Sequence, residues 1–210
     1  MASQFIPRAA FPTASFLIVA AMAASFSTHV FAAPVELTPG ENGWSYELTK
    51  GYLYECPLHE AMTARAHRGD ENEKAYIRCQ TFYSYGQSAE LSSSDENSTD
   101  PNGQWSEQLD EGKEDGHDYT CKNGEVMTGM ERSGDENGHT KYRCSVVKIN
   151  GEIKKMHPAT QRKEKESAHL FACPTGQALI RRAHLCTGSG SACDENQDTI
   201  YQCGYIRAVD

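Results

Sequence analysis

The sequence lacks an excess of basic residues. Its 20 Lys and Arg residues stand against 29 Asp and Glu residues, so the formal net charge is −9. Nucleic-acid binders need clustered cations that replace the counterions of phosphates, and anionic membrane surfaces attract cationic segments. The acidic balance therefore argues against both classes. We expect an extracellular glycan or protein as the partner, and no nucleic acid.

The sequence also lacks an apolar run of the roughly 20 residues that a membrane-spanning helix needs. Its main apolar stretch, residues 16–26, follows the single charge of Arg8 and precedes a Val30-Phe31-Ala32 step. This pattern predicts a secretory signal peptide over residues 1–32, with an uncleaved anchor as the alternative. We expect residues 33–210 to form a single repeat domain that is secreted or periplasmic, with no integral membrane segment.

Known catalytic motifs are absent as well. The sequence contains neither G-x-S-x-G nor H-E-x-x-H nor a glycine-rich phosphate loop. His67 and His184 occupy matching places in two of the repeat units described below, and Arg132 replaces them in the other. We expect these basic groups to pair with a nearby Asp or Glu, because a general base needs a placed partner and a tuned pKa. The sequence therefore predicts no enzyme and no catalytic residue.

Cysteine, in contrast, is abundant. The chain has eight cysteines, all of them after residue 32. None forms a C-x₂-C pair, which disfavours a zinc site. An even number of cysteines in an exported chain predicts disulfides.

The cysteine spacing reveals an internal repeat. Two segments place cysteines 23 positions apart, and a third places them 30 apart around an insertion with its own cysteine pair. Removing seven residues around that pair restores the spacing of 23. Eight cysteines allow many pairings, and the repeat selects one of them. The predicted disulfides are Cys56–Cys79, Cys121–Cys144, Cys173–Cys203 and Cys186–Cys193.

The three segments share more than their cysteines. Each has an aromatic residue two positions before its first cysteine, an apolar residue six positions after it, a second aromatic just before its last cysteine and an Asp-Glu-Asn triplet. The aromatic positions are Tyr54, Tyr119 and Phe171, then Tyr76, Tyr142 and Tyr201, and the apolar positions are Met62, Met127 and Leu179. We place the units at residues 44–82, 105–148 and 162–206, the first two introduced by Trp44 and Trp105.

The residue pattern within a unit predicts a β-hairpin. Residues 125–130 and 141–144 alternate between apolar and polar side chains, which is typical of half-buried strands. A Gly-Asp-Glu-Asn turn lies between them. Because one hairpin is marginal in water, the units must pack together. The predicted fold is all-β, with three homologous disulfide-stapled β-hairpin units packed into one compact pseudo-threefold domain.

The Asp-Glu-Asn turns are the candidate ligand sites. Their oxygen atoms suit Ca²⁺ or the hydroxyls of a sugar, although Asp and Asn are also ordinary turn formers. We expect no other cofactor. The residues are Asp70, Glu71 and Asn72, then Asp135, Glu136 and Asn137, then Asp194, Glu195 and Asn196.

Two connectors are polar. Residues 84–104 have the composition of a loop and include an N-glycosylation sequon at Asn97. Residues 148–166 hold six Lys or Arg against three Glu. We expect this second connector to be a short helix or a solvated linker, with an anionic-glycan patch as the functional alternative.

The chain resembles the dermatopontin family over residues 44–148, and more loosely to residue 206. The similarity rests on the Trp-led approach to each of the first two units and on two sequence runs, Tyr54-Glu55-Cys56-Pro57 and the residues 119–130 with Ser133 and Asp135. The resemblance implies a secreted, disulfide-looped, β-rich protein that binds matrix proteins and glycosaminoglycans. Invertebrate relatives act as lectins and cell-aggregating factors.

The function expected from the sequence is therefore binding. We predict a secreted non-enzymatic protein that recognises glycans or an extracellular surface or matrix protein, in the manner of a lectin or an adhesion protein. The alternative, from a different class, is a toxin-like or inhibitory exported effector that acts on a protein partner.

Overall fold

The computed structural model describes residue 44 and residues 51–69, 74–84, 86–93, 103–110, 116–133, 138–185 and 197–207. Contacts divide the chain into Met1–Glu36 and Leu37–Asp210, and all described residues belong to the second unit. The predicted signal peptide over residues 1–32 lies outside the described residues. No helix within the described ranges is long and apolar enough to cross a membrane.

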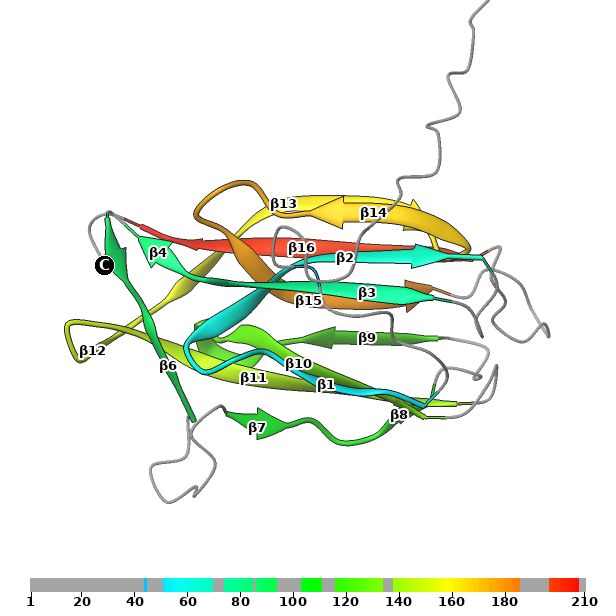
Figure 1. Ribbon diagram of the computed structural model, residues 1–210, viewed down its shortest axis with the longest axis horizontal. Coiled ribbons are helices and arrows are strands. Elements are labelled where there is room, and N and C mark those ends of the chain that lie inside the picture. The colour runs from blue at the N-terminus through cyan, green and yellow to red at the C-terminus, as the bar shows by residue number, and fades with distance from the viewer. Residues whose placement is uncertain are drawn as a thin grey trace, which may run out of the picture. The chain divides into compact units, whose positions relative to one another are not determined.

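The described chain is built of antiparallel β-strands, as predicted, with one 3₁₀ turn, η2, at Lys122–Gly124 (Figure 1). The strands are β1 (Leu53–Glu55), β2 (Glu60–Arg68), β3 (Ala75–Thr81), β4 (Tyr83–Ser84), β5 (Gln87–Ser88), β6 (Glu90–Ser92), β7 (Gln104–Trp105), β8 (Leu109–Asp110), β9 (His117–Thr120), β10 (Val126–Ser133), β11 (His139–Ile149), β12 (Glu152–Lys154), β13 (Met156–Lys165), β14 (Ala168–Ala172), β15 (Ala178–Leu185) and β16 (Asp198–Ile206).

Three long hairpins dominate the structure: β2–β3, β10–β11 and β15–β16. A disulfide closes each hairpin, and the three bonds are Cys56–Cys79, Cys121–Cys144 and Cys173–Cys203. Three of the predicted pairs are thus confirmed, and the fourth, Cys186–Cys193, lies outside the described residues. The disulfides indicate that the protein folds in an oxidising environment.

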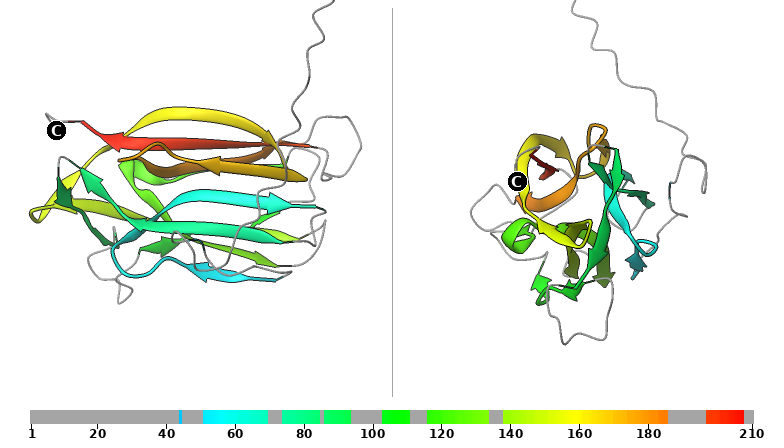
Figure 2. Two further views of the ribbon diagram at one scale, coloured as in Figure 1. Left: turned by 45° about the horizontal axis from the view of Figure 1, so that its top comes forward. Right: turned by 90° about the vertical axis from the view of Figure 1, so that its left-hand side faces the viewer.

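Each hairpin pairs with a strand that belongs, by sequence, to another hairpin. The strand β1 precedes β2 in the chain but pairs with β10. In the same way β9 precedes β10 but pairs with β15, and β14 precedes β15 but pairs with β2. These pairings link the three hairpins in a closed cycle, and their long strands run along a common direction (Figure 1, Figure 2).

A bulge in the first strand of each hairpin supports this cycle. The extra residues are Thr63, Thr128 and Ile180, at the register shifts of β2, β10 and β15. A bulge frees a carbonyl from the ladder of its own hairpin. Each freed carbonyl accepts a hydrogen bond of 2.8–2.9 Å from the N–H of a cysteine in another unit, in the pairs Cys173–Thr63, Cys56–Thr128 and Cys121–Ile180.

The central core lies where β2, β10 and β15 contact one another. It contains the three disulfides and the apolar side chains opposite them: Met62 faces Cys79, Met127 faces Cys144 and Leu179 faces Cys203. A second apolar cluster lies beyond the disulfides and consists of Ala61, Phe82, Ala89, Leu91, Val126, Val147, Ile149, Met156, Ala178, Ile180 and Ile206. The apolar residues six positions after each first cysteine are therefore core residues.

One predicted equivalence is wrong. Tyr142 and Tyr201 are central core residues, but Tyr76, which the sequence aligns with them, packs in a separate cluster with Trp44. In the register of β2 and β3, the inward position belongs to Ile77, which lies opposite Arg65. Tyr76 is three positions before its cysteine and the other two tyrosines are two positions before theirs. Because side chains alternate along a strand, this one-residue offset puts Tyr76 on the opposite face.

The prediction for residues 148–166 is also wrong. This stretch is neither a helix nor a solvated linker: it continues β11, forms β12 and then forms β13, which pairs with β16 along most of its length. Residues 84–104 also contribute short strands, of which β6 and β7 pair with β11. In both connectors the long neighbouring strands offer free backbone edges, and pairing with an edge overrides the polar composition.

Removal of one staple should weaken the fold by a defined amount. We expect the pair Cys121→Ala and Cys144→Ala to lower the free energy of unfolding by about 3 kcal/mol, because the disulfide no longer restricts the unfolded chain. Urea denaturation of a protein that comprises residues 33–210 measures this change. A non-reducing peptide map should show the three bonds within their own hairpins, and a bond between two hairpins would contradict the structure.

Candidate functional site

The acidic turns that the sequence offers as ligand sites lie outside the described residues. This holds for all nine positions: Asp70, Glu71, Asn72, Asp135, Glu136, Asn137, Asp194, Glu195 and Asn196. Within the described part of the chain, no group of three or more His, Cys, Asp or Glu side chains is placed to hold a metal ion. Calcium binding at the turns therefore stays a prediction.

A buried polar network lies next to the central core, on the side toward the ends of β2 and β15. Its basis is one position on the first strand of each hairpin, three residues beyond the core Met or Leu. This position holds Arg65 in β2 and Arg182 in β15, but Met130 in β10. All three side chains are buried. Two of the three hairpins therefore direct a guanidinium into the interior.

Arg65 begins a chain of hydrogen bonds between hairpins. Its Nη1 donates to the hydroxyl of Tyr201 at 2.5 Å, and that hydroxyl lies 2.8 Å from Nε2 of His169. Nδ1 of His169 lies 2.8 Å from the carbonyl oxygen of Lys165. A carbonyl only accepts, so Nδ1 carries the proton and Nε2 accepts from Tyr201. A neutral imidazole of His169 therefore completes this chain of hydrogen bonds.

Arg182 begins an equivalent chain. Its Nη1 donates to the hydroxyl of Tyr142 at 2.7 Å, and that hydroxyl lies 2.7 Å from Nε2 of His117. In the second hairpin, where Met130 replaces the arginine, Tyr52 occupies the position of the histidine and its hydroxyl lies 3.5 Å from the Met130 sulfur. At this third contact between hairpins, Met130 thus replaces the arginine and Tyr52 replaces the histidine.

Glu166 joins the two arginines. One of its carboxylate oxygens, Oε1, lies 3.1 Å from Nη1 of Arg65 and 3.0 Å from Nη2 of Arg182. Its backbone carbonyl accepts a hydrogen bond of 2.7 Å from Nδ1 of His67. Burial alone would raise the pKa of Glu166, but the two guanidiniums hold this pKa well below its usual range. Glu166 is therefore an ionised carboxylate shared by two hairpins.

The histidines around Glu166 stay neutral. Burial, and then the positive charge of Arg65, lowers the pKa of His67 to about 4. Burial also lowers the pKa of His169 to about 3; the negative charge of Glu166 only partly offsets this effect, and the positive charge of Arg65 adds to it. Neither imidazole is protonated near neutral pH.

This network holds the hairpins together and is closed to ligands. Arg65 is 0% exposed and Glu166 is 1% exposed. The sequence predicted that the basic group at His67 pairs with a nearby acid; the partner is instead the backbone of Glu166, 99 positions away in the chain. Glu166 itself was missed, because nothing in the local sequence distinguishes it from the other acids of its charged stretch.

A surface pocket of about 390 Å³ lies between β7, β9 and η2. Its lining residues are Gln104, Trp105, Ser106, Glu107, Leu109, Tyr119, Lys122 and Glu125. Two aromatic side chains, both partly exposed, thus meet a set of polar groups of both charges. Trp105 and Tyr119 belong to the aromatic positions that the repeat singled out, but the sequence does not show that they line one pocket.

The residues around Trp105 fix the position of its ring. β7 pairs Trp105 with Arg143, and the Arg143 guanidinium lies 5.8 Å from the centre of the indole ring. On the other side of Arg143 in the sheet stands Gly129, where an added Cβ would lie 3.2 Å from the indole. Gly103, with a φ of +105°, lets β7 approach so closely that a Cβ there would lie 1.9 Å from the carbonyl oxygen of Cys144. Both glycines are needed for this approach.

The ring of Tyr119 packs on a neighbouring aromatic ring, and its hydroxyl stays protonated. Its ring stacks on that of Tyr142, with ring centres 5.1 Å apart and planes inclined by 12°. Burial, and then the negative charge of Glu125, raises the pKa of Tyr119. The hydroxyl is therefore a stable donor next to a carboxylate acceptor, a combination that suits a ligand with hydroxyl groups.

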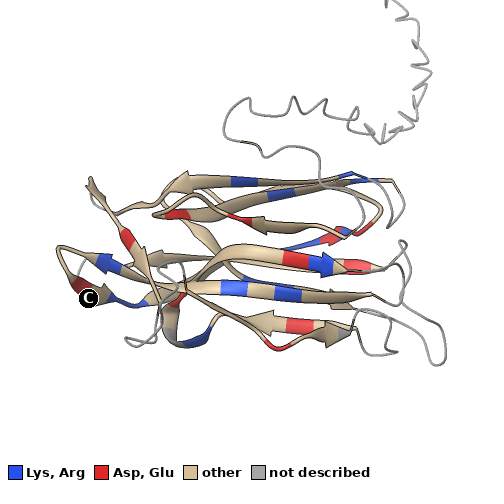
Figure 3. Ribbon diagram, turned by 60° about the horizontal axis from the view of Figure 1, so that its bottom comes forward, with Lys and Arg blue, Asp and Glu red and all other residues tan. Residues whose placement is uncertain are grey.

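Charge on the described surface is mixed. Figure 3 shows acidic and basic segments interleaved along the strands in that view. The basic residues of β13, which the sequence offered as an anionic-glycan patch, have acidic neighbours: Lys163 and Lys165 both pair with Asp198, at 2.5 and 3.0 Å. This pairing weakens the case for a cationic patch on β13.

Replacement of Glu166 should be costly. We expect Glu166→Gln to lower the free energy of unfolding by about 3–5 kcal/mol, because it removes the carboxylate that two buried guanidiniums share. Glu131→Gln is the control, since Glu131 forms a partly exposed ion pair with Lys141, and it should cost about 1 kcal/mol or less. Denaturant unfolding measures both. Equal effects of the two substitutions would contradict the role assigned to Glu166.

Stability should fall on mild acidification. In the unfolded chain the two imidazoles titrate near 6.5, whereas in the folded protein the pKa is about 4 for His67 and about 3 for His169. The unfolded state therefore binds more protons between these values, and stability is complete above pH 6.5 and declines below it. We expect a loss of about 2 kcal/mol for each histidine between pH 7.5 and pH 5.

Urea denaturation at several pH values checks this decline. His67→Asn, whose amide nitrogen replaces Nδ1, should remove about half of it. An unchanged pH dependence in this variant would show that His67 is not one of the groups responsible.

No protein-family model matches the chain, and no curated protein and no solved structure is detectably similar to it. The resemblance to the dermatopontin family thus stays a prediction from the residues quoted above.

Proposed function

We propose that this chain is an exported, non-enzymatic binding protein that recognises a carbohydrate through the pocket between β7, β9 and η2. One observation carries the proposal: Trp105 and Tyr119 line the same pocket, together with polar side chains of both charges. A sugar ring has apolar C–H faces that pack on aromatic rings and hydroxyls that both donate and accept hydrogen bonds. This pocket offers both kinds of contact.

The size and order of the pocket support the proposal. A volume of about 390 Å³ is within the range of small-ligand sites, and it suits one or two sugar rings. Ser106 anchors the pocket wall to β11, because its N–H donates to the carbonyl of Tyr142 and its Oγ accepts from the N–H of the same residue. Little ordering entropy is therefore lost on binding.

We further propose that the three hairpins are copies of one unit, arranged around a pseudo-threefold axis. The cyclic strand pairing, the three bulges and the three disulfides at matching positions support this arrangement. The predicted acidic turns would then be three similar tips, and they are a second candidate contact for the same ligand.

A glycan array with the mature protein tests the proposed function. We expect binding to a limited set of glycans, and we expect Trp105→Ala to weaken it by about tenfold or more, because the aromatic surface that packs on the sugar ring is lost. Tyr205→Ala is the matched control, since this aromatic residue of β16 lies outside the pocket lining and should leave binding unchanged.

The other outcomes are equally informative. Loss of binding in a variant with Asp135→Ala and Asn137→Ala, but not in Trp105→Ala, would move the site to the acidic turns. Cleavage of a bound oligosaccharide, seen as a change in product mass, would contradict a non-enzymatic role. A blank array for the intact protein would overturn the proposal, and the exported-effector alternative would then be tested by its effect on a protein target.

A further inference from the structure

The three hairpins can be compared at one row of residues that crosses each sheet beside its disulfide. In an antiparallel ladder, directly opposed residues share a face of the sheet. The row of the first hairpin reads Ala172, Ala64, Arg78, Trp44; that of the second reads Glu55, Gly129, Arg143, Trp105; that of the third reads Thr120, Arg181, Gln202, Gln161. Each row contains one arginine.

In two rows a carboxylate compensates the arginine. Nη1 of Arg143 lies 2.9 Å from Oε1 of Glu55, which stands in the same row. Arg181 makes a two-pronged contact with Asp118, with Nε and Nη2 lying 2.7 and 2.6 Å from the two carboxylate oxygens. The second and third rows are thus electrically balanced.

The first row has no such partner. Ala172 stands where Glu55 stands in the second row, and within the described part of the chain no carboxylate lies within ion-pair distance of Arg78. Burial lowers the pKa of Arg78. Its remaining contacts are a face-on approach to the Trp44 ring, 5.3 Å from the ring centre, and a hydrogen bond from Nε to Thr63 at 3.3 Å.

The uncompensated guanidinium lines the larger of the two described pockets. This cavity has a volume of about 610 Å³ and lies between β3 and the loop that follows Cys173. Other lining side chains are Thr63, Gln80, Tyr83, Thr175 and Gln177. The pocket is therefore rich in hydroxyl and amide groups, with Glu60 on its wall as the carboxylate of the lining.

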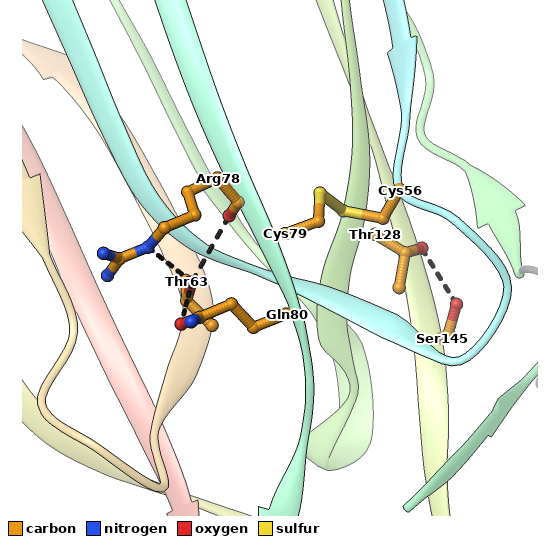
Figure 4. Close-up of a disulfide and its surroundings, with 7 residues drawn as sticks. All are labelled: Cys56, Thr63, Arg78, Cys79, Gln80, Thr128 and Ser145. Atoms are coloured by element: carbon orange, nitrogen blue, oxygen red, sulfur yellow. Dashed lines mark hydrogen bonds between the residues drawn. A yellow bond between two sulfur atoms is a disulfide. The ribbon is translucent and has the colours of Figure 1, made fainter. Parts of the chain in front are cut away.

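The hydrogen bonds on the pocket wall leave donors for a ligand. The hydroxyl of Thr63 donates to Oε1 of Gln80 at 3.0 Å, so the amide nitrogen of Gln80 stays available. Figure 4 shows that the terminal nitrogens of Arg78 point away from Thr63 and Gln80, while Nε is held. A guanidinium fixed through Nε presents two parallel N–H groups, which match the two oxygens of a carboxylate or sulfate.

We propose that the pocket at Arg78 is a second ligand site, which binds a sugar that carries an oxyanion. The arginine receives the oxyanion as Arg143 receives the carboxylate of Glu55, and the surrounding amides and hydroxyls contact the sugar hydroxyls. The choice of a sugar rests on the proposed function; the requirement for a negative charge rests on Arg78 alone. A carboxylate in a uronic acid and a sulfate ester share the required chemistry.

Titration calorimetry tests the proposal with three probes: a neutral oligosaccharide, a uronic-acid oligosaccharide and a sulfated oligosaccharide. We expect the intact protein to prefer at least one charged probe over the neutral one by about tenfold or more, because hydrogen bonds to charged groups are the stronger ones. Which charged probe binds decides between carboxylate and sulfate.

Two variants, each taken from another row of the same protein, should abolish this preference. Arg78→Gln copies the third row, where Gln202 stands at this position, and Ala172→Glu copies the second row and supplies an internal carboxylate to Arg78. Ala172 is exposed, so a longer side chain fits there. Arg162→Gln is the control, because it removes the same charge from an exposed position 61% open to solvent and should keep the preference.

The outcomes separate this inference from the proposed function. A preference for charged probes that survives in Arg78→Gln overturns the inference, and neutral-sugar binding that is still lost in Trp105→Ala would leave the proposed function standing. Equal binding of charged and neutral probes by the intact protein likewise overturns the inference and leaves the proposed function standing. Failure of every probe to bind the intact protein overturns both.

Discussion

The structure depends on the pairing of each hairpin with the strand that introduces a different hairpin. A two-stranded hairpin with one buried face is not stable alone. Here each hairpin receives a third strand from elsewhere in the chain, and the bulge carbonyl of Thr63, Thr128 or Ile180 accepts the N–H of the cysteine that ends this strand. This cyclic exchange of strands ties the three hairpins to one another.

This constraint explains why charged residues are buried at the centre. The cyclic arrangement brings Arg65 and Arg182 from two hairpins toward the same interior space, and Glu166 from a separate turn compensates both. Met130 shows that an apolar residue also fits this position. Buried ion pairs contribute little net stability, but they penalise every arrangement that leaves one member unpaired. We infer that the network selects the register and the neighbours of the hairpins more than it strengthens them.

The surface follows from the same arrangement. The three hairpins share a bulge at matching positions, but they differ in the residues of the row beside each disulfide. Glu55 balances Arg143 beneath Trp105, which leaves the aromatic ring for the pocket, and Ala172 leaves Arg78 uncompensated. The described part of the chain thus carries two pockets of different chemistry.

The sequence by itself determined the all-β class and three of the disulfides, because cysteine spacing and alternation of apolar residues are local properties of the chain. It placed Met62, Met127 and Leu179 in the core for the same reason. The sequence-based prediction failed at Tyr76, where an offset of one residue puts the side chain on the opposite face. It also failed at residues 148–166, where a polar stretch forms strands that pair with neighbouring strands.

Only the tertiary structure decided which strand completes which hairpin, and therefore which side chains meet. Arg78 and Ala172 are 94 positions apart, and their places in one row follow from the pairing of β14 with β2. Glu166 and Arg65 are likewise brought together across 101 positions. Long-range pairing depends on the free edges that remain after the local elements have formed, and no local pattern in the sequence encodes them.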